Sequence, residues 1–410
     1  MSDSPRVLIV GAGHAGGTAA ALLRQYGFEG PIALVGEEPI PPYQRPPLSK
    51  AWLKGEADED ALTLKPAEWY AEAGVDLWLA APVASIDRAD RKVTLSDGER
   101  LPYDILILAT GARARPLPVA GADLSGVLSL RSAADAEALK TALGPGKRIV
   151  VVGGGYVGLE AAASALALGA EITVVEREDR VLARVASRTL SSFFQDYHQT
   201  QGVTFHLGAR VTGFDGVDGK VTAVRLADGA TLPCDVALVG IGALPNVELA
   251  AGCGLALADG IVVDGEARTS DPAIFAIGDC TWRPMPLYGR ELRLESVPNA
   301  LEQAKQAASA IAGRAPPPSE VPWFWSDQYD LKLQMAGLAD GADEIVVRGD
   351  QAAGRFAVFH LREGVLTAVE AVNAPPEFMG GRQMIGRQAR VDPAKLADTA
   401  VSMKEVAAGQ

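Results

Sequence analysis

The stretch Val7-Leu-Ile-Val-Gly-Ala-Gly-His-Ala-Gly16 decides the fold of the chain. Its four apolar residues predict a buried strand, and the glycines after them predict a tight turn that opens an alanine-rich helix. Gly11 permits the turn, Gly13 allows close approach of a pyrophosphate, and Gly16 lets the helix lie close to the strand. The unpaired N–H groups at the start of such a helix attract an anion. The stretch therefore predicts a nucleotide-binding turn.

The same pattern returns later as Ile149-Val-Val-Val-Gly-Gly-Gly-Tyr-Val-Gly158, with glycines at the same three places. Each copy leads through a helix to a strand that ends at an acidic residue, Glu37 in the first copy and Glu176 in the second. A carboxylate at this place can accept hydrogen bonds from ribose hydroxyls. The alternative for Glu37 is an ordinary solvated residue at a strand end. One glycine turn is a weak signal, but two copies indicate two nucleotide-binding modules.

Strand, turn and helix signals extend both copies into an α/β fold. We expect two Rossmann-like dinucleotide-binding domains and a C-terminal α+β domain, in which three antiparallel strands precede a helical segment from Glu377. The expected domains cover residues 1–112 with 245–320 (discontinuous), 113–244, and 321–410. The expected helices are 18–26, 159–168 and 297–312, and the expected strands include 32–35, 172–176, 344–347, 355–361 and 365–372.

Composition limits the classes of partner and compartment. The net charge of −13 argues against nucleic acid or an anionic membrane as the main partner. No apolar stretch is long enough to span a bilayer and the N-terminus lacks a signal-peptide pattern, so we expect a cytoplasmic protein. The three cysteines (Cys234, Cys253 and Cys280) have neither disulfide nor zinc spacing. The four histidines show no ligand pairing and are interpreted as surface or packing residues, so no metal site is expected.

Two dinucleotide modules suggest hydride passage from a nicotinamide to a flavin. Longer motifs identify the family that the chain resembles, which is the FAD-dependent NADH:ferredoxin reductases of the putidaredoxin reductase type within the two-dinucleotide-binding flavoproteins. The resemblance covers nearly the whole chain. Besides the second glycine turn, its motifs are Pro46-Pro-Leu-Ser-Lys50, Ala109-Thr-Gly111, Gly278-Asp279, Glu295-Ser-Val-Pro-Asn-Ala300 and Pro322-Trp-Phe-Trp-Ser-Asp-Gln328.

The resemblance assigns FAD to the first module and NADH to the second. It implies two catalytic residues, Lys50 beside the flavin and Glu160 in the nicotinamide site, which we expect to pair with each other. Without it, Lys50 reads as a solvent-facing lysine, and Glu160 is explained equally well by the helix dipole. The FAD residues that it implies are Gly11, Gly13, Ala15, Gly16, Glu37, Lys50, Val83, Arg131, Asp279, Val297 and Trp325. The expected NAD residues are Gly153, Gly155, Tyr156, Val157, Gly158, Glu176 and Gly242.

The family branch follows from a missing cysteine. Disulfide reductases and peroxidases of the superfamily carry redox cysteines after the first module, whereas residues 39–53 contain none. We therefore expect direct electron transfer to a [2Fe-2S] ferredoxin that serves a haem-thiolate or Rieske-type oxygenase. The alternatives are an NADH oxidase, an apoptosis-inducing-factor-like NADH dehydrogenase with oxygen or quinone as acceptor, or a flavin-binding interaction protein without turnover.

The remaining expectations concern assembly and docking. We expect a monomer or weak dimer. Because ferredoxins of this type are generally acidic, an acidic enzyme needs a local basic surface to meet one. The candidates in the sequence are Arg290, Arg293, Arg382, Arg387 and Arg390. Each alone reads more simply as an ordinary solvated residue.

Overall fold

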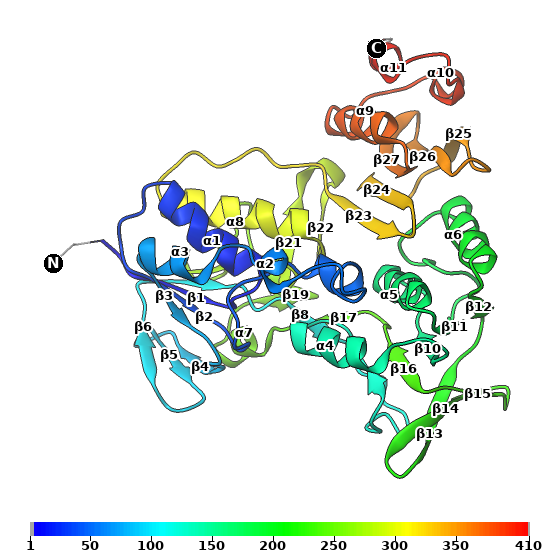
Figure 1. Ribbon diagram of the computed structural model, residues 1–410. Coiled ribbons are helices and arrows are strands. Elements are labelled where there is room, and N and C mark those ends of the chain that lie inside the picture. The colour runs from blue at the N-terminus through cyan, green and yellow to red at the C-terminus, as the bar shows by residue number, and fades with distance from the viewer. Residues whose placement is uncertain (1–3, 409–410) are drawn as a thin grey trace. The chain divides into compact units, whose positions relative to one another are not determined.

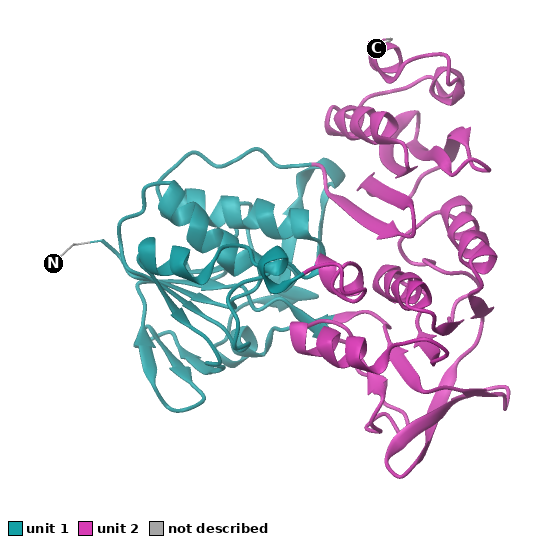
Figure 2. Cartoon of the chain, viewed as in Figure 1, with its two compact units in different colours: residues 1–45, 58–113, 244–320 teal, residues 46–57, 114–243, 321–410 magenta. Residues whose placement is uncertain are grey.

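A computed structural model describes residues 4–408 of the chain, and these form two compact units (Figure 1, Figure 2). Unit 1 takes the chain up to Arg45 and adds residues 58–113 and 244–320. Unit 2 comprises residues 46–57, residues 114–243 and the chain from Val321 onward. The units are defined by packing alone, so the three domain boundaries expected from the sequence stay a prediction.

A parallel five-stranded sheet forms the centre of unit 1, in the order β20-β7-β1-β2-β3. One face of this sheet packs against three helices through alanine-rich surfaces, and the other face packs against a three-stranded meander and a short helix. The sheet strands are β1 (Val7–Val10), β2 (Ile32–Val35), β3 (Val75–Trp78), β7 (Ile105–Leu108) and β20 (Ile274–Ala276). The three helices are α1 (His14–Gln25), α3 (Ala67–Glu72) and α8 (Val297–Ile311).

Smaller elements complete unit 1. The meander is β4 (Val83–Asp87), β5 (Lys92–Leu95) and β6 (Arg100–Pro102), and the short helix is α7 (Glu248–Gly252). A four-stranded sheet contains β18 (Leu257–Ala258), β19 (Gly260–Val262), β21 (Thr281–Met285) and β22 (Arg290–Leu292). The other elements are α2 (Glu59–Leu62) and the 3-10 turn η2 (Pro286–Tyr288), with β8 (Ala112–Ala114) and β17 (Ala243–Pro245) where the chain passes between units.

Unit 2 repeats the architecture of unit 1, as the two glycine turns predict. Its parallel sheet has the order β12-β11-β10-β16-β9, so β10 is flanked by β11 and β16 as β1 is flanked by β2 and β7. The sheet strands are β9 (Val127–Leu128), β10 (Arg148–Val152), β11 (Glu171–Val175), β12 (Thr204–His206) and β16 (Val236–Val239). The helices are α4 (Ala133–Ala142), α5 (Tyr156–Ala167) and α6 (Arg188–Thr200), with the turn η1 (Pro46–Ser49). The meander is β13 (Val211–Val217), β14 (Lys220–Leu226) and β15 (Thr231–Pro233).

The C-terminal part of unit 2 is an antiparallel sheet in the order β23-β24-β27-β26-β25. This sheet and helices α5 and α6 share one apolar core with the parallel sheet. The strands are β23 (Trp323–Gln328), β24 (Leu331–Gly337), β25 (Glu344–Asp350), β26 (Arg355–Arg362) and β27 (Val365–Val372). The helices are α9 (Pro375–Gly386), α10 (Pro393–Ala397) and α11 (Met403–Ala408).

The predicted fold class is confirmed, but several predicted elements differ from the structure. Helices α1 and α5 begin three to four residues earlier than expected, because Gly13 and Gly155 themselves are the N-cap residues. The C-terminal sheet has five strands where the sequence suggested three, since the residues of β23 were interpreted only as a family motif and β24 was not predicted. Among residues 4–408, no helix combines the length and the apolar character that crossing a membrane requires.

Candidate functional site

The first glycine turn joins β1 to α1 at the point where the sheet order reverses, which is where open α/β sheets bind ligands. Gly11 has φ of 115°, and a Cβ there would lie 2.1 Å from the carbonyl oxygen of Ala109. A Cβ at Gly16 would lie 2.0 Å from the carbonyl oxygen of Gly11. At Gly13, by contrast, a Cβ would meet nothing within 4 Å. Gly11 and Gly16 are therefore required by packing, whereas Gly13 leaves open space for a ligand.

The N-termini of α1 and α5 differ from those of several other helices. Side chains cap α2, α4, α6, α8 and α10, but the glycine N-caps of α1 and α5 make no side-chain cap bond. The backbone N–H groups of the first turn are thus left available for an anion at both glycine turns. The two turns have the donors that two pyrophosphate groups need.

The acidic residues after β2 separate into two roles. Glu38 accepts hydrogen bonds from the Tyr43 hydroxyl at 2.7 Å and from the Arg45 guanidinium at 2.7 Å. Glu37 is exposed at the end of the strand. Glu38 is occupied by protein donors whereas Glu37 is exposed, and the contact of Glu37 with a ribose stays a prediction.

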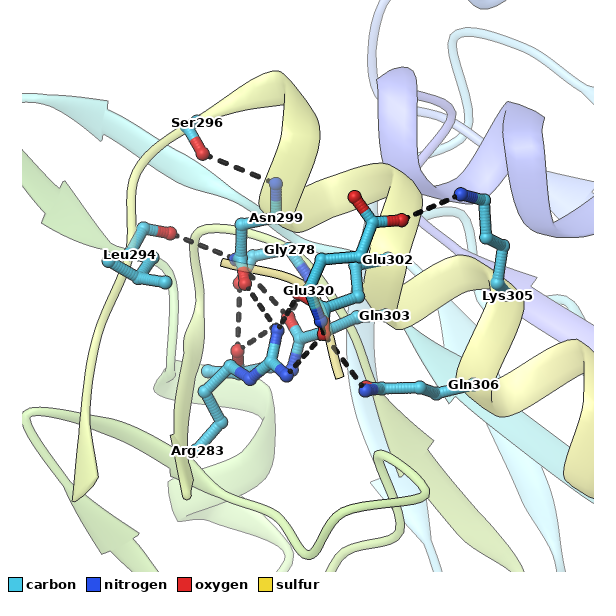
Figure 3. Close-up of polar contacts among 11 residues, drawn as sticks. Gly278, Arg283, Leu294, Ser296, Asn299, Glu302, Gln303, Lys305, Gln306 and Glu320 are labelled. Carbon is cyan, nitrogen blue, oxygen red and sulfur yellow. Dashed lines mark hydrogen bonds and ion pairs between the residues drawn. The ribbon is translucent and has the colours of Figure 1, made fainter. Parts of the chain in front are cut away.

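A buried polar cluster connects the end of β20 to the first turns of α8 (Figure 3). The Gln303 side-chain oxygen accepts from the Gly278 backbone N–H and from the Thr281 hydroxyl, both at 2.8 Å. Arg283 and Glu302 form an ion pair with contacts of 2.9 and 3.1 Å, and both side chains are about 95% buried. This cluster holds the turn that carries Asp279, three residues after the end of β20, and the first turns of α8, which begins at Val297.

His14 is a site candidate that the sequence reasoning assigned to the surface or to packing. It is the first residue of α1, and its Nδ1 is buried without a hydrogen-bond partner among the described residues. Burial lowers the pKa of His14, and the nearby Asp279 carboxylate opposes this effect. A buried imidazole nitrogen without a partner, beside a glycine turn, fits contact with a bound group. No local sequence pattern distinguishes such a histidine from a packing residue.

The second glycine turn repeats the geometry of the first. Gly153 has φ of 110°, and a Cβ there would lie 2.4 Å from the carbonyl oxygen of Gly240. A Cβ at Gly158 would lie 2.6 Å from the carbonyl oxygen of Gly153, whereas one at Gly155 would meet nothing within 4 Å. The same division into two packed glycines and one open glycine therefore applies to this turn.

The carboxylate of Glu176 lies against the second turn. One oxygen accepts from the Gly154 backbone N–H at 2.6 Å, and the other accepts from the Glu178 backbone N–H at 2.9 Å. Two backbone donors hold the carboxylate against the second glycine turn, and its contact with a ribose stays a prediction. Val157 is half-exposed at the start of α5, while Tyr156 points into the protein and donates to the Met335 sulfur at 2.8 Å. Gly242 lies after β16 with φ of 107°.

Lys50 and Glu160 form the expected pair. The Lys50 ammonium lies 2.6 Å from one Glu160 oxygen and 3.1 Å from the carbonyl oxygen of Pro46. Two serine hydroxyls also donate to the carboxylate, that of Ser49 at 2.5 Å and that of Ser326 at 2.6 Å. Glu160 is 4% exposed, so this carboxylate is satisfied by one cation and two hydroxyls. The serines were not singled out by the sequence reasoning, although both stand inside its motifs.

The remaining candidates occupy separate places. Val83 opens β4 in unit 1, and Arg131 lies just before α4 in unit 2. Trp325 stacks on Trp323 with ring centroids 5.5 Å apart, and the Arg382 guanidinium lies 5.4 Å from the centre of the Trp323 ring. The structure thus joins one predicted docking cation to the tryptophan pair of β23.

The other predicted docking residues differ in their charge balance. Arg293 is paired with Asp259 and Glu295, and its side chain is 13% exposed, so it presents little free positive charge. Arg387 and Arg390 are exposed, and Arg390 donates to the carbonyl oxygen of Glu363 at 2.6 Å. Arg290 is exposed on β22. Arg382, Arg387 and Arg390 are called the C-terminal cations below.

The chain is similar along its length to proteins of known class. A model of the pyridine nucleotide-disulphide oxidoreductase family matches residues 5–304, and a reductase C-terminal model matches residues 323–407. A probable ferredoxin reductase, CtmF of Castellaniella defragrans, is 52% identical over 99% of this chain and 100% of its own. Putidaredoxin reductase CamA of Pseudomonas putida is 44% identical over 100% of this chain and 98% of its own. The crystal structure of a covalent putidaredoxin reductase–putidaredoxin complex matches with a TM-score of 0.97 at 43% identity, covering 100% of this chain and 99% of that one.

Proposed function

Since this chain belongs to the pyridine nucleotide-disulphide oxidoreductase family, we propose that it is an NADH-dependent reductase of a [2Fe-2S] ferredoxin. It is an oxidoreductase enzyme, and the enzymes of its family use FAD and NAD(P)H. The observation that carries the proposal is the pair of glycine turns, each with two tightly packed glycines, one open glycine and an uncapped helix. Two such turns fit two dinucleotides.

FAD belongs to the turn of unit 1. The α1 N–H groups bind the pyrophosphate, Glu37 accepts from the ribose, and the polar cluster of α8 keeps Asp279 and Val297 in place for the rest of the cofactor. Bound FAD supplies the redox chemistry, since it accepts a hydride from NADH and releases electrons one at a time. Lys50 would supply a positive charge to the flavin, and Glu160, 2.6 Å from the ammonium, would balance that charge.

NADH belongs to the turn of unit 2, and Glu176 selects it over NADPH. The carboxylate is fixed by two backbone N–H groups, so it accepts from the ribose hydroxyls without further ordering. A 2′-phosphate would meet this negative charge at close range. Two unit charges about 4 Å apart repel by roughly 4 kcal/mol at an effective dielectric of 20, and solvent and salt reduce this by about half.

The acceptor is a ferredoxin that delivers electrons to a haem-thiolate or Rieske-type oxygenase. Two relatives carry ferredoxin reductase or putidaredoxin reductase names, and the matched crystal structure is a complex with putidaredoxin. The C-terminal cations fit an acidic partner, because Arg387 and Arg390 are exposed and Arg382 covers the Trp323 ring. The enzyme is expected to act in the cytoplasm as a monomer or weak dimer, which fractionation and analytical ultracentrifugation will test.

Cytochrome c reduction by NADH, with and without added [2Fe-2S] ferredoxin, tests the proposed acceptor. We expect the ferredoxin to raise the rate strongly. Rapid oxygen or quinone reduction that ferredoxin does not change would instead favour the oxidase or dehydrogenase alternatives. Failure of NADH to bleach the flavin within about a second of mixing would leave only a binding protein, since typical turnover numbers are about 1–1,000 per second.

Charge reversal tests the docking surface. Replacing the three C-terminal cations by glutamate should raise KM for the ferredoxin and flatten its salt dependence, because rim charges act mainly on association and are screened within about 8 Å. Ferricyanide reduction, which needs no docking, should stay unchanged. The matched control is Arg188→Glu, since Arg188 is 75% exposed on α6 and outside the proposed surface. Equal effects of the control and the triple variant would exclude this surface.

A further inference from the structure

A series of hydrogen bonds extends from Glu160 through the interior of unit 2 to a tyrosine. Ser326 donates to Glu160 at 2.6 Å, and the Gln328 amide nitrogen donates to the Ser326 hydroxyl at 3.1 Å. The Gln328 oxygen lies 2.8 Å from Nε2 of His198, and the Tyr329 hydroxyl lies 3.0 Å from Nδ1 of the same ring. This set, named the Glu160–Tyr329 series, connects β23, α5, α6 and the turn after β23.

The series is enclosed by protein along most of its length. Ser326, Gln328 and His198 are at most 1% exposed, whereas Tyr329 is half-buried and its neighbour Asp330 is exposed. Buried polar groups of this kind need hydrogen-bond partners, and the members of the series supply them to one another. Tyr329 also has φ of 55°, a left-handed conformation that would suit glycine or asparagine better than tyrosine. The turn alone therefore does not account for a tyrosine at this position.

The donors of the series have a defined direction when Glu160 is ionised. A carboxylate can only accept, so Ser326 must use its single proton on Glu160 and accept from the Gln328 amide. The Gln328 oxygen then accepts from His198, which places the imidazole proton on Nε2. Nδ1 is left to accept from the Tyr329 hydroxyl. Every bond in the series is then satisfied, and every donor points towards Glu160.

The opposite direction is equally complete when Glu160 is protonated. The carboxylic acid donates to Ser326, Ser326 donates to the Gln328 oxygen after the amide has turned over, and the amide nitrogen donates to Nε2 of His198. The imidazole proton then lies on Nδ1 and is donated to the Tyr329 oxygen. The series therefore has two self-consistent arrangements, and they differ in the protonation of Glu160 and in the tautomer of His198.

We propose that His198 and Tyr329 are positioning residues for Glu160, and that the tautomer of His198 is coupled to the protonation state of that carboxyl group through Gln328 and Ser326. The Tyr329 hydroxyl favours the arrangement in which Ser326 donates to the carboxylate. In that arrangement the phenol donates to Nδ1, and a phenol O–H is a better donor than an imidazole N–H, while an imidazole nitrogen is a better acceptor than a phenol oxygen. This inference rests on the proposed function only in linking Glu160 to turnover. The series itself follows from the contacts in unit 2.

The titratable groups around the series are consistent with this assignment. Glu160 is faced by Lys50 and, within α5, by Tyr156, whose pKa is raised well above its usual value mainly by burial. Glu370 is the next carboxylate, facing Tyr156 from β27. Burial lowers the pKa of His198 to about 4, so its ring is neutral near pH 7 and carries its single proton on either Nδ1 or Nε2. Tyr329 faces it directly, and burial holds the pKa of that phenol above its usual value.

Nitrogen-15 NMR of the imidazole tests the series without using turnover. In the wild-type holoenzyme at pH 7 we expect His198 to be protonated on Nε2. Tyr329 bonds to Nδ1 in both tautomers, so Tyr329→Phe removes only the difference between the two bonds. The ratio of the Nδ1–H to the Nε2–H tautomer should therefore rise, because the bond in which the phenol donates is the stronger of the two. The matched control is Tyr197→Phe, because Tyr197 stacks 5.6 Å from Tyr329 but its hydroxyl bonds to Asp330. A wild-type Nδ1–H tautomer, or equal effects of the two variants, would overturn the proposal.

Stopped-flow reduction of the flavin by NADH tests the link to Glu160. Tyr329→Phe and Ser326→Ala should both move the acid limb of the pH profile to higher pH, by about one pH unit for Ser326→Ala, since the ionised carboxylate loses a direct donor. Tyr197→Phe should leave the profile unchanged. A tautomer shift with an unaltered acid limb overturns the coupling while the proposed function stands. If NADH fails to reduce the wild-type flavin, the proposed function fails and the tautomer measurement still decides the series.

Discussion

Replacing the buried His198 by glutamine should make the protein less sensitive to acid. Burial lowers the pKa of His198 from the usual 6.5 to about 4, despite the opposing effect of its hydrogen bond to the Gln328 oxygen. Because the folded-state pKa lies below the unfolded one, the unfolded chain binds more protons between these values. Stability is therefore highest above about pH 6.5 and is lost as the pH falls towards 4. The difference of 2.5 in pKa corresponds to about 3 kcal/mol in all, of which about 2 kcal/mol is lost between pH 7.5 and 5.

Urea unfolding at pH 7.5 and pH 5, at one ionic strength, measures this loss. Glutamine does not titrate in this range, so His198→Gln should lose about 2 kcal/mol less than wild type between the two pH values. Its absolute stability at pH 7.5 falls by about 1 kcal/mol through an imperfect bond to Tyr329. Tyr197→Phe is the control, because the hydrogen bond to Asp330 and burial raise the Tyr197 pKa to about 12. His14, whose pKa is also lowered by burial, adds the same pH dependence to the stability of all three proteins, so its effect cancels in the comparison. Identical pH dependence of wild type and His198→Gln would refute the reasoning.

Three further outcomes follow from the two glycine turns and the thiols. Glu176→Ala should bring the kcat/KM values for NADPH and NADH within a few-fold, whereas wild type should favour NADH at least about tenfold; an unchanged ratio would exclude Glu176 as the selector. Gly11→Ala should destabilise unit 1 by about 2 kcal/mol or more in thermal unfolding, because the added Cβ would meet backbone atoms. Gly13→Ala should fold normally and bind FAD more weakly, because its Cβ would enter the open space at the turn. Replacing all three cysteines by alanine should leave flavin reduction and electron output near wild type, and a variant that accepts hydride without passing electrons on would contradict direct transfer.

The sequence predicted the parts of the fold that local patterns encode. Apolar runs followed by glycines predicted β1 and β10 and the repeat of the two sheets, because backbone geometry at Gly11 and Gly153 admits few other residues. The first turns of α1 and α5 were missed, because helix prediction relies on side-chain caps that these turns lack. The pairing of Lys50 with Glu160 was expected from the family resemblance alone, since 110 residues separate the two in the chain.

The polar interior of unit 2 could not be predicted from local patterns. His198 and Gln328 are 130 residues apart, and neither residue type is expected to be fully buried. A histidine on an amphipathic helix reads as a surface or packing residue until its partner is known. The same limit applied to Ser49, whose hydroxyl contact with Glu160 depends on the approach of η1 to α5. Such contacts depend on tertiary packing, which the spacing of residues along the chain does not record.

Strand β23 shows how one short motif can serve two purposes, because side chains of a strand alternate between its faces. Trp323 and Trp325 lie on one face, where Arg382 covers the first ring. Ser326 and Gln328 lie on the other face and form the middle of the Glu160–Tyr329 series. A shift of one residue in the pairing of β23 with β24 would exchange these faces and bury the tryptophans against Glu160. The register of this hairpin therefore keeps the proposed docking surface and the buried carboxylate on opposite sides of one strand, so substitutions among the C-terminal cations should leave the pH dependence of flavin reduction unchanged.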